Sequence, residues 1–402
     1  MRRLCGVNIF PISSSNMVFV VLKAIPLFFV RGSGASSVVL VVHVYDVICS
    51  GPRQDVDQLF SSLGKELSVK FAPPLCCTGD SCRFLGRTIN RLDVGYSVAV
   101  DDKFIDLCIR SLNLSSAKTV DTPSVPRPGT ISDELLLPLN AEDHHQYRAG
   151  VGRLAYISAD RFDLMFTVKA LSRNLVSPSA YDMQCLKRAV RYISGHRDFT
   201  YLAQCTEIPR VIETYVDSDW GSCPQSRRST SGGFVVLGTS VVSAWSRTQP
   251  TVALSSVEAE LTAACVGAQE SLLIQTLLSE LGIDASISLS TDSAGCLSHL
   301  SRLGVGRLKH IQLRSAFLQE LVRRKSIFLK KILGLLNPAD LLTKAVDRRT
   351  LGRLLSSPLV SLTCPSSSSS SSPSSDDVDV VECNAVDLEC LSYCPFLSSF
   401  VM

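Results

Sequence analysis

The stretch "YVDSDW", Tyr215–Trp220, places two aspartates two residues apart between apolar neighbours. In an extended strand successive side chains alternate between the two faces, so Asp217 and Asp219 would point to the same side. Two carboxylates on one face repel each other unless a positive charge lies near them. A solvated strand edge would also explain the pair, because aspartate is common on surfaces. The surrounding sequence has to decide between a site and a surface.

The segments around this stretch alternate between strand and helix patterns. Strands are predicted at 208–220, 230–242, 243–250, 285–293 and 326–332. A long amphipathic helix opens at "LSSVEAEL", where Ser255 and Glu258 have capping-box spacing. A basic helix from about Leu308 to Lys325 follows, and "NPADLLTKAV" predicts a last helix with Asn337 as its cap. The order indicates an α/β fold in which helices flank a mixed sheet.

Composition changes along the chain divide it into five predicted segments. Continuous β-branched residues in "SSVVLVVHVYDVICSG" predict one buried strand within the first segment. Prolines punctuate the second segment, helical spacing marks the third, and a serine run followed by acids predicts disorder in the fifth. The predicted segments are 1–120, a linker at 121–142, a helical segment at 143–204, the α/β domain at 205–350 and a disordered tail at 351–402.

Composition narrows the class of protein without naming a partner. The chain has 402 residues, of which 46% are hydrophobic, so it is long enough to build a sizeable core. Its 15 cysteines show no paired zinc-type spacing, and we interpret them as reduced thiols of an intracellular protein, cytoplasmic or nuclear. The apolar runs near the N-terminus are interrupted by polar residues and are too short to span a bilayer, so no membrane is expected.

Acidic residues recur at the ends of the predicted elements. Asp292 follows a strand at the edge where α/β proteins usually place their sites, and Asp340 lies in the first turn of the last helix. A close group of carboxylates stays ionised when cations share its charge, and oxygen ligands favour Mg²⁺ or Mn²⁺. Two such ions would activate a water and stabilise the leaving oxygen of a phosphodiester. Nucleic-acid hydrolysis is therefore the hypothesis.

The long helix offers two acids, Glu258 and Glu260. At 3.6 residues per turn they lie about 200° apart around the helix axis, so only one of them is expected to face the site. Both border the apolar stripe, and periodicity does not choose between them.

Five motifs between Tyr215 and Lys344 resemble, in order, the RNase H domain of copia-type LTR retrotransposon Pol polyproteins. They are "YVDSDWGSCPQSRRSTSGGFVVLG", "QPTVALSSVEAEL", "STDS", "KHI" and "NPADLLTK". The resemblance implies an RNase H-like fold and a ribonuclease that cuts the RNA strand of an RNA/DNA hybrid with Mg²⁺. It implies as the catalytic and metal-binding acids Asp217, Glu260, Asp292 and Asp340. Asp219 then has a supporting role.

Segments further upstream resemble the reverse transcriptase of the same family. "YRAGVGRLAYISADRFDLMFTVKALSRNL" resembles the connection to RNase H, and "PLFFVRGSGASSVVLVVHVYDVICSG" resembles the end of the polymerase palm. The family carries two adjacent aspartates in that palm turn, where this sequence has Tyr45 and Asp46. We expect a truncated palm that lacks the other metal-binding strand and does not synthesise DNA, because polymerase chemistry needs those acids to hold its metals.

Clustered cations predict a nucleic-acid surface. They are Arg227, Arg228, Lys309, Arg314, Arg323 and Arg324, which could neutralise backbone phosphates of a hybrid. A solvated helix face is the alternative. Gln312 and Ala316 replace an acid and a histidine of the family pattern, so an inactive nucleic-acid-binding remnant is the second hypothesis for function. Other parts of a retrotransposon polyprotein are the further partners that the resemblance implies.

Overall fold

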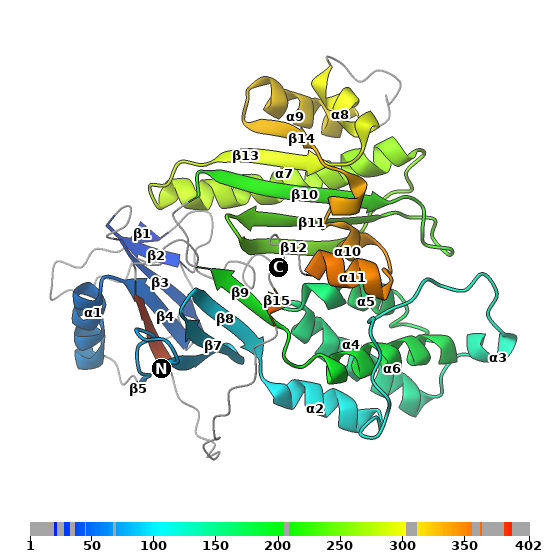
Figure 1. Cartoon of the computed structure of the whole chain (residues 1–402), viewed down its shortest axis with the longest axis horizontal. Helices are drawn as coiled ribbons and strands as arrows, with labels where there is room; N and C mark the ends of the chain where they lie inside the picture. Colours follow the sequence, from blue (N-terminus) through cyan, green and yellow to red (C-terminus); the bar gives the residue numbers. More distant parts are fainter. Residues whose placement is uncertain are drawn as a thin grey trace.

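The computed structural model gives the chain a five-stranded sheet, two further sheets, and a group of helices that lies below the five-stranded sheet and beside the other two (Figure 1). Tyr45 and Lys309 lie outside the described residues. The residues that it describes are 20–21, 28–32, 37–44, 46–66, 70–204, 209–302, 312–355, 362–363 and 382–387.

The five-stranded sheet is built from the segment around "YVDSDW". Its order is β12-β11-β10-β13-β14, with β10 central. β10 pairs antiparallel with β11 and parallel with β13, so the sheet is mixed. This confirms the predicted α/β fold. The strands are β10 (Val211–Asp219), β11 (Thr230–Leu237), β12 (Ser240–Thr248), β13 (Ser286–Thr291) and β14 (Ile327–Lys331).

Helix α7 (Ser256–Glu280) covers one face of this sheet. Gly267 allows the close approach, because a Cβ at this position would lie 2.5 Å from Val216 Cγ1 on β10. In the described part of the chain, α7 is also the one helix long and apolar enough to cross a membrane, but 67% of its apolar window is buried in the protein. It is the core helix of the sheet. The other helices here are α8 (Ala294–Ser301), α9 (Gln312–Arg323), η3 (Gly334–Leu336), α10 (Asp340–Thr343) and α11 (Arg348–Leu355).

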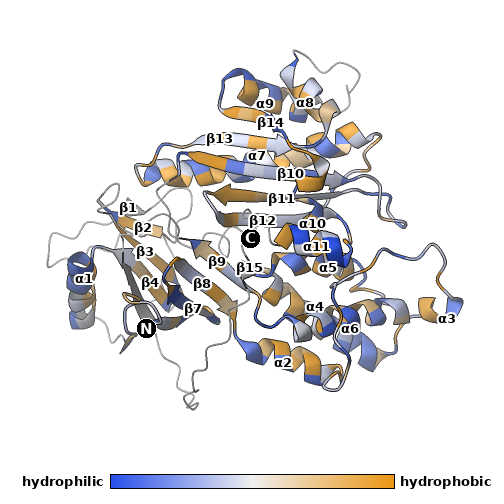
Figure 2. Cartoon of the chain, viewed as in Figure 1, coloured by the Kyte–Doolittle hydropathy of each residue, from blue (hydrophilic) through white to orange (hydrophobic). Residues whose placement is uncertain are grey.

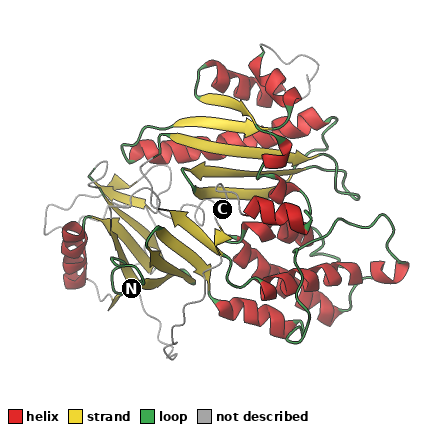
Figure 3. Ribbon diagram, in the orientation of Figure 1, coloured by secondary structure: helices red, strands yellow, loops and turns green. Residues whose placement is uncertain are grey.

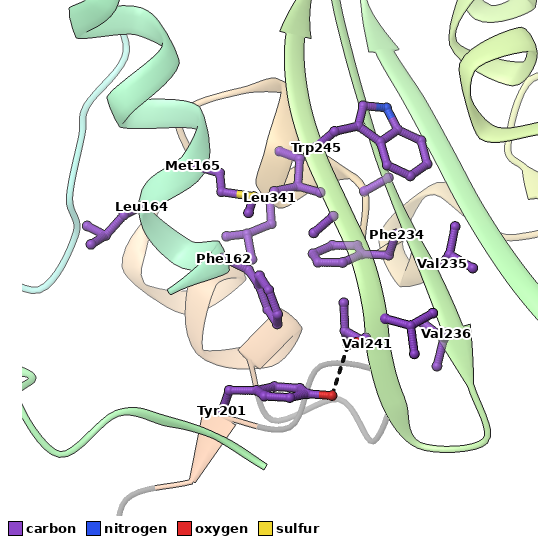
Figure 4. Packing of buried hydrophobic residues seen from close by; sticks show 14 of the residues in the cluster. Phe162, Leu164, Met165, Tyr201, Phe234, Val235, Val236, Val241, Trp245 and Leu341 are labelled. Carbon is purple, nitrogen blue, oxygen red and sulfur yellow. Dashed lines mark hydrogen bonds between the residues drawn. The ribbon is translucent and has the colours of Figure 1, made fainter. Parts of the chain in front are cut away.

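The helical segment packs against the opposite face and shares its core. Phe162 is 1% exposed, and its ring lies edge-on to Phe234 of β11 and to Tyr201, with centroids 5.7 and 5.6 Å apart (Figure 4). Tyr201 donates a hydrogen bond of 2.9 Å to Val241 O (Figure 4). Figure 3 shows this region as a cluster of helices below the sheet. Its helices are α2 (Asp102–Ser111), α3 (Asp133–Leu136), α4 (Ala141–Ser158), α5 (Phe162–Ser172) and α6 (Ala180–Gly195).

Two further sheets form the N-terminal region together with three strands from later in the chain, β9, β15 and β16. One has the order β1-β2-β3-β4-β16-β5, with helix α1 (Arg53–Glu66) packed on β3 and β4 through Val56 and Leu59. The other has the order β15-β9-β8-β7-β6. The strands are β1 (Val20–Val21), β2 (Phe28–Arg31), β3 (Val38–His43), β4 (Asp46–Gly51), β5 (Lys70–Phe71), β6 (Ser81–Phe84), β7 (Arg87–Leu92), β8 (Gly95–Val100), β9 (Thr200–Gln204), β15 (Leu362–Thr363) and β16 (Glu382–Asp387).

Several local predictions were wrong, each for a physical reason. The single strand predicted in "SSVVLVVHVYDVICSG" is a hairpin of β3 and β4, since Val44 adopts a left-handed turn conformation with φ of 54° that apolar composition does not signal. The second hairpin turns at Gly238, with φ of 60°, so β12 begins three residues earlier than predicted. α10 begins at Asp340, two residues later than the predicted helix start at Pro338. Asn337 Oδ1 still accepts 3.2 Å from Ala339 N–H, as a cap does, while its Nδ2 donates to Val216 O of β10.

The five predicted segments stay a prediction. Of the predicted tail, 351–402, the structure describes the end of α11 and the strands β15 and β16, elements that the serine-rich composition does not indicate. β11 is buried along its whole length, and its second half, Phe234–Leu237, is apolar (Figure 2), as expected for a strand covered on both faces.

Candidate active site at the carboxyl ends of the strands

Three carboxylates meet where β10 and β13 end. Asp217 comes from β10, Glu260 from α7 and Asp292 from the residue after β13. One oxygen from each lies within 4.8 Å of the other two. Among the described residues this is the one group of His, Cys, Asp or Glu side chains close enough to share a metal ion. The structure thus brings together three of the four predicted acids.

The sheet topology explains the convergence. β10 and β13 are parallel neighbours, so their carboxyl ends open at the same edge, where α/β proteins place ligands. Asn337 donates from Nδ2 to Val216 O over 3.0 Å and thereby fixes the start of α10 beside β10. Thr343, at the end of α10, donates a hydrogen bond to Asp217 Oδ2.

The helix start separates the two glutamates that periodicity left open. Glu258 serves the helix end: its Oε2 accepts a hydrogen bond of 2.6 Å from Leu254 N, and its own N–H donates 3.2 Å to Ser255 Oγ. Glu260 lies in the acid group and is 8% exposed. Its position agrees with the choice that the family resemblance implies.

Burial and mutual repulsion raise the pKa of each of the three acids. Burial, followed by the charges of Asp217 and Asp292, raises the pKa of Glu260 to about 8. Burial raises the pKa of Asp217 to about 6, with the hydrogen bond from Thr343 opposing the shift and Asp340 adding to it. The pKa of Asp292 is also raised, first by burial and then by Asp217. The group is therefore poorly neutralised by the protein itself.

Asp340 lies beside the group and has a cation of its own. Its Oδ1 forms an ion pair of 2.8 Å with Lys344 Nζ, one helical turn further on. Burial lowers the pKa of Lys344, but its hydrogen bond to Asp340 and the charges of Asp217, Asp340 and Asp292 more than offset this and raise it. The sequence prediction missed Thr343 and Lys344. Their spacing from Asp340 within "ADLLTK" is the signal that could have found them, since residues three and four apart share a helix face.

The donor set fits a divalent metal ion. Glu260 Oε2 is buried and has no hydrogen-bond partner among the described residues, and a bare buried carboxylate oxygen is costly unless a cation is near. Three carboxylates with no nitrogen or sulfur donor match Mg²⁺ or Mn²⁺. Asp217, Glu260 and Asp292 are the residues that would hold the ion.

An apolar segment borders the acids. A Cβ at Gly334 would lie 2.9 Å from Asp292 Oδ2, so any other residue would crowd the carboxylate. The neighbouring side chains Leu333, Leu335 and Leu336 are 69%, 71% and 57% exposed. No pattern in the sequence indicated an exposed leucine group at the site.

The predicted cations do not form one continuous surface. Arg227 and Arg228 are exposed in the loop after β10, at the acid end of the sheet, and Arg314 donates 3.4 Å to Thr262 of α7. Arg323 and Arg324 lie at the opposite end, because α9 leads into the start of β14, and a strand of five residues spans roughly 17 Å. Both pair with Glu320, over 2.6 and 2.5 Å. The carboxylate of Glu320 therefore offsets part of the positive charge of these two arginines.

The hairpin in the N-terminal region has no comparable group. Asp46 begins β4 opposite His43. Burial raises its pKa, and His43 opposes the shift. No other acid joins Asp46 in a metal-sized group within the part of the chain that the structure describes.

Comparisons with known proteins point to one family. The chain is 29% identical over 326 residues to the retrovirus-related Pol polyprotein from transposon RE1 of Arabidopsis thaliana, and 30% identical over 327 residues to that from transposon RE2. Each match covers 80% of this chain but only 21% and 22% of the relative, so the chain spans about a fifth of their length. No protein-family model matches.

A solved structure, RNase H1 from the archaeon Halobacterium salinarum, is 18% identical and aligns with 33% of this chain and 94% of its own. The TM-score of this alignment is 0.25. The assignment of the fold rests on the order of the strands in the sheet. The matches to the plant Pol proteins extend over four-fifths of the chain. Over four-fifths of its length the chain is homologous to retrovirus-related Pol polyproteins of copia-type transposons.

Proposed function

We propose that the α/β domain is a divalent-metal-dependent ribonuclease that cuts the RNA strand of an RNA/DNA hybrid. The observation that carries the proposal is the group of Asp217, Glu260 and Asp292, whose oxygens lie within 4.8 Å and include the unpartnered Glu260 Oε2. Mg²⁺, bound as two ions, is the proposed cofactor, and Mn²⁺ would substitute for it. The RNA/DNA hybrid as substrate follows from the family.

The protein residues divide the work of the site. Three carboxylates would hold metal ions, which supply an activated water and stabilise the leaving oxygen of a phosphodiester when bound. Thr343 orients Asp217 through its hydrogen bond, and the cap formed by Glu258 fixes the start of the helix that carries Glu260. Arg227 and Arg228, exposed at the same end of the sheet, are placed to meet backbone phosphates.

The polymerase portion is proposed to be inactive. Asp46 stands without a second acid in the described part of the hairpin, and Tyr45 replaces the neighbouring family aspartate. Because nucleotide transfer needs carboxylates that hold two metal ions, primer extension by the purified chain is not expected.

An inactive nucleic-acid-binding remnant is the second candidate, and one observation favours it. Lys344 already places a positive charge on Asp340, 2.8 Å away, where a fourth metal-binding acid is predicted. If that ion pair persists when substrate binds, the fourth acid is not available. The hybrid would then bind, more weakly at high salt, without being cut.

The deciding experiment measures cleavage of a labelled RNA/DNA hybrid by the full chain, with and without Mg²⁺. We expect Mg²⁺-dependent cleavage that is lost in Asp217→Asn. Asp219→Asn is the matched control, because it removes a carboxylate two residues along the same strand but outside the acid group. Intact RNA from the folded protein, with binding retained, would establish the remnant instead.

A further inference from the structure

A cavity of about 330 Å³ lies beside the acid group, between the helical segment and the α/β domain. Its walls come from the proline-rich loop 123–127, from α5 and α6, from the loop after β10 and from the residues after α10. Lys344 is part of the wall, so the cavity adjoins the site through the partner of Asp340. The volume is within the range of small-molecule sites, which begins at roughly 300 Å³.

Two residues of the wall, Thr167 and Arg188, each carry a buried polar atom that the protein leaves without a hydrogen-bond partner. Thr167 is 3% exposed, and its hydroxyl has no hydrogen bond, although a threonine in a helix can usually donate to the carbonyl four residues earlier. Arg188 Nε is also buried without an acceptor, while its Nη2 donates 2.8 Å to Thr122. Buried polar groups are nearly always satisfied, so an unpaired hydroxyl and an unpaired N–H on residues of one cavity wall are an unusual feature that a hydrogen-bonding occupant would explain.

The charge on the wall favours an anion. Within the described residues, Arg127, Arg173 and Arg188 form no ion pair with a carboxylate. Two carboxylates, Asp182 and Asp219, also line the cavity, and Asn174 and Ser179 already donate to Asp182 over 2.7–2.8 Å. Arg173 donates to the Thr248 hydroxyl over 3.1–3.2 Å, which leaves its charge without a carboxylate partner. Guanidinium groups in such a setting match phosphate oxygens.

The pKa of Lys169, a residue of α5 close to Arg173, reflects the same excess of positive charge. Burial, followed by the charge of Arg173, lowers the pKa of Lys169 to about 7, although Asp219 opposes the shift. Its ammonium donates 2.6 Å to the Thr230 hydroxyl, a neutral partner. An anion in the cavity would relieve this repulsion.

The rest of the wall suits a flat apolar group. Phe166 and Tyr181 line it together with prolines of the loop, and the guanidinium of Arg127 lies 5.1 Å from the centre of the Tyr181 ring. Aromatic and guanidinium planes are the surfaces on which bases stack. A phosphate alone would leave this part of the cavity without a match.

We propose that this cavity binds a nucleoside monophosphate group, with the phosphate at Thr167, Arg173 and Arg188 and the base against Phe166 and Tyr181. The group would come either from a free mononucleotide or from the phosphorylated end of a strand. The proposed site uses none of the acids Asp217, Glu260 and Asp292 and does not depend on hydrolysis, so its test does not depend on the proposed nuclease activity.

The test is titration calorimetry of the full chain in EDTA, which prevents metal-dependent cleavage, with adenosine monophosphate as probe. Adenosine and inorganic phosphate are titrated separately. We expect the monophosphate to bind at least about tenfold more tightly than either part, since both halves of the cavity then contribute. Equal or weaker binding than inorganic phosphate, or no binding, would overturn the proposal.

Three variants locate the binding. Arg188→Gln and Thr167→Val should each weaken it, by roughly tenfold and several-fold, because each removes a group that we assign to the phosphate. Arg148→Gln removes an exposed arginine of α4 outside the cavity and should change nothing.

The thermal midpoint of Thr167→Val separates a ligand group from a structural one. An unpartnered hydroxyl can be replaced by a methyl without loss of stability, so the midpoint should be unchanged or higher. A lower midpoint with unchanged binding would show that the hydroxyl is structural and that the proposal is wrong. Competition with a 5′-phosphorylated oligonucleotide then identifies the source: displacement at lower concentration than the free mononucleotide indicates a strand end, and no displacement indicates a free nucleotide.

Discussion

Two regions of the chain place an acid beside a strand of a sheet, and only one of them builds a site. At the end of β10 and β13, three carboxylates from elements far apart in the sequence lie within 4.8 Å. At the β3–β4 hairpin, Asp46 faces His43 across the turn with no second acid in its group among the described residues. A short acidic motif is common to both regions, so the motif itself does not make the difference. The difference lies in whether a helix and a second parallel strand deliver further acids to the same point.

Glu260→Gln should have the largest effect on cleavage and so remove the difference between the two regions. It removes the carboxylate with the unpartnered oxygen, and we expect hybrid cleavage to fall about 1000-fold, equivalent to about 4 kcal/mol of lost metal-assisted stabilisation. Steady-state cleavage rates of the full chain measure this.

Glu258→Gln is the matched control for this variant, two residues earlier on the same helix. It keeps an oxygen that can accept from Leu254 N–H, so cleavage should change less than about tenfold, in proportion to a partly weakened cap. Equal losses in the two variants would contradict the assignment of Glu260 to the site.

Phe162→Ala tests how the α/β domain depends on the helical segment. Because the ring is buried between Phe234 and Tyr201, its removal should lower the free energy of unfolding by about 3 kcal/mol. Chemical denaturation followed by tryptophan fluorescence would report this, since Trp245 is buried in the same core.

Leu59→Ala, in the small core between α1 and the hairpin, is the comparison for Phe162→Ala. It should unfold the N-terminal region more easily and leave cleavage unchanged. A loss of cleavage in Leu59→Ala alone would reverse the order of importance that we assign to the two regions.

The pH dependence of stability should also differ between the regions. The pKa of Glu260 is raised to about 8 and that of Asp217 to about 6. At any pH between the ordinary pKa of such a group and its raised pKa, the folded state binds more protons than the unfolded state. Stability in EDTA should therefore fall as pH rises from about 4.5 to about 8. Each tenfold by which folding tightens proton binding to a carboxylate contributes at most about 1.4 kcal/mol to this loss of stability.

Thermal unfolding in EDTA and in Mg²⁺ measures this effect. Mg²⁺ should reduce the fall, because the cation replaces the protons, and Glu260→Gln should flatten it. Asp46→Asn should leave the effect of Mg²⁺ unchanged. A stability that rises with pH over this range in EDTA would contradict the raised pKa values of the carboxylates.

The succession of strands and helices along the chain, and the positions of the acids on them, were predictable because they depend on local patterns. Alternating and helical periodicity located β10, α7 and β13, and the carboxyl-end rule for α/β sheets located Asp292. The hairpin at Val44 was not predictable from its apolar run, because a left-handed turn without glycine carries no compositional signal.

The sequence by itself determined that this chain has an α/β domain with acids at its strand ends, since periodicity and residue type are properties of neighbouring residues. Periodicity left open which glutamate joins Asp217, and the family resemblance implied Glu260. The tertiary structure brings Glu260 to Asp217, because the direction of a side chain on α7 depends on how the helix packs against the sheet. The pairing of Asp340 with Lys344 and the cavity around Thr167 likewise depend on atoms brought together from separate segments. Distances across space, and the burial that shifts each pKa, exist only once the core has formed.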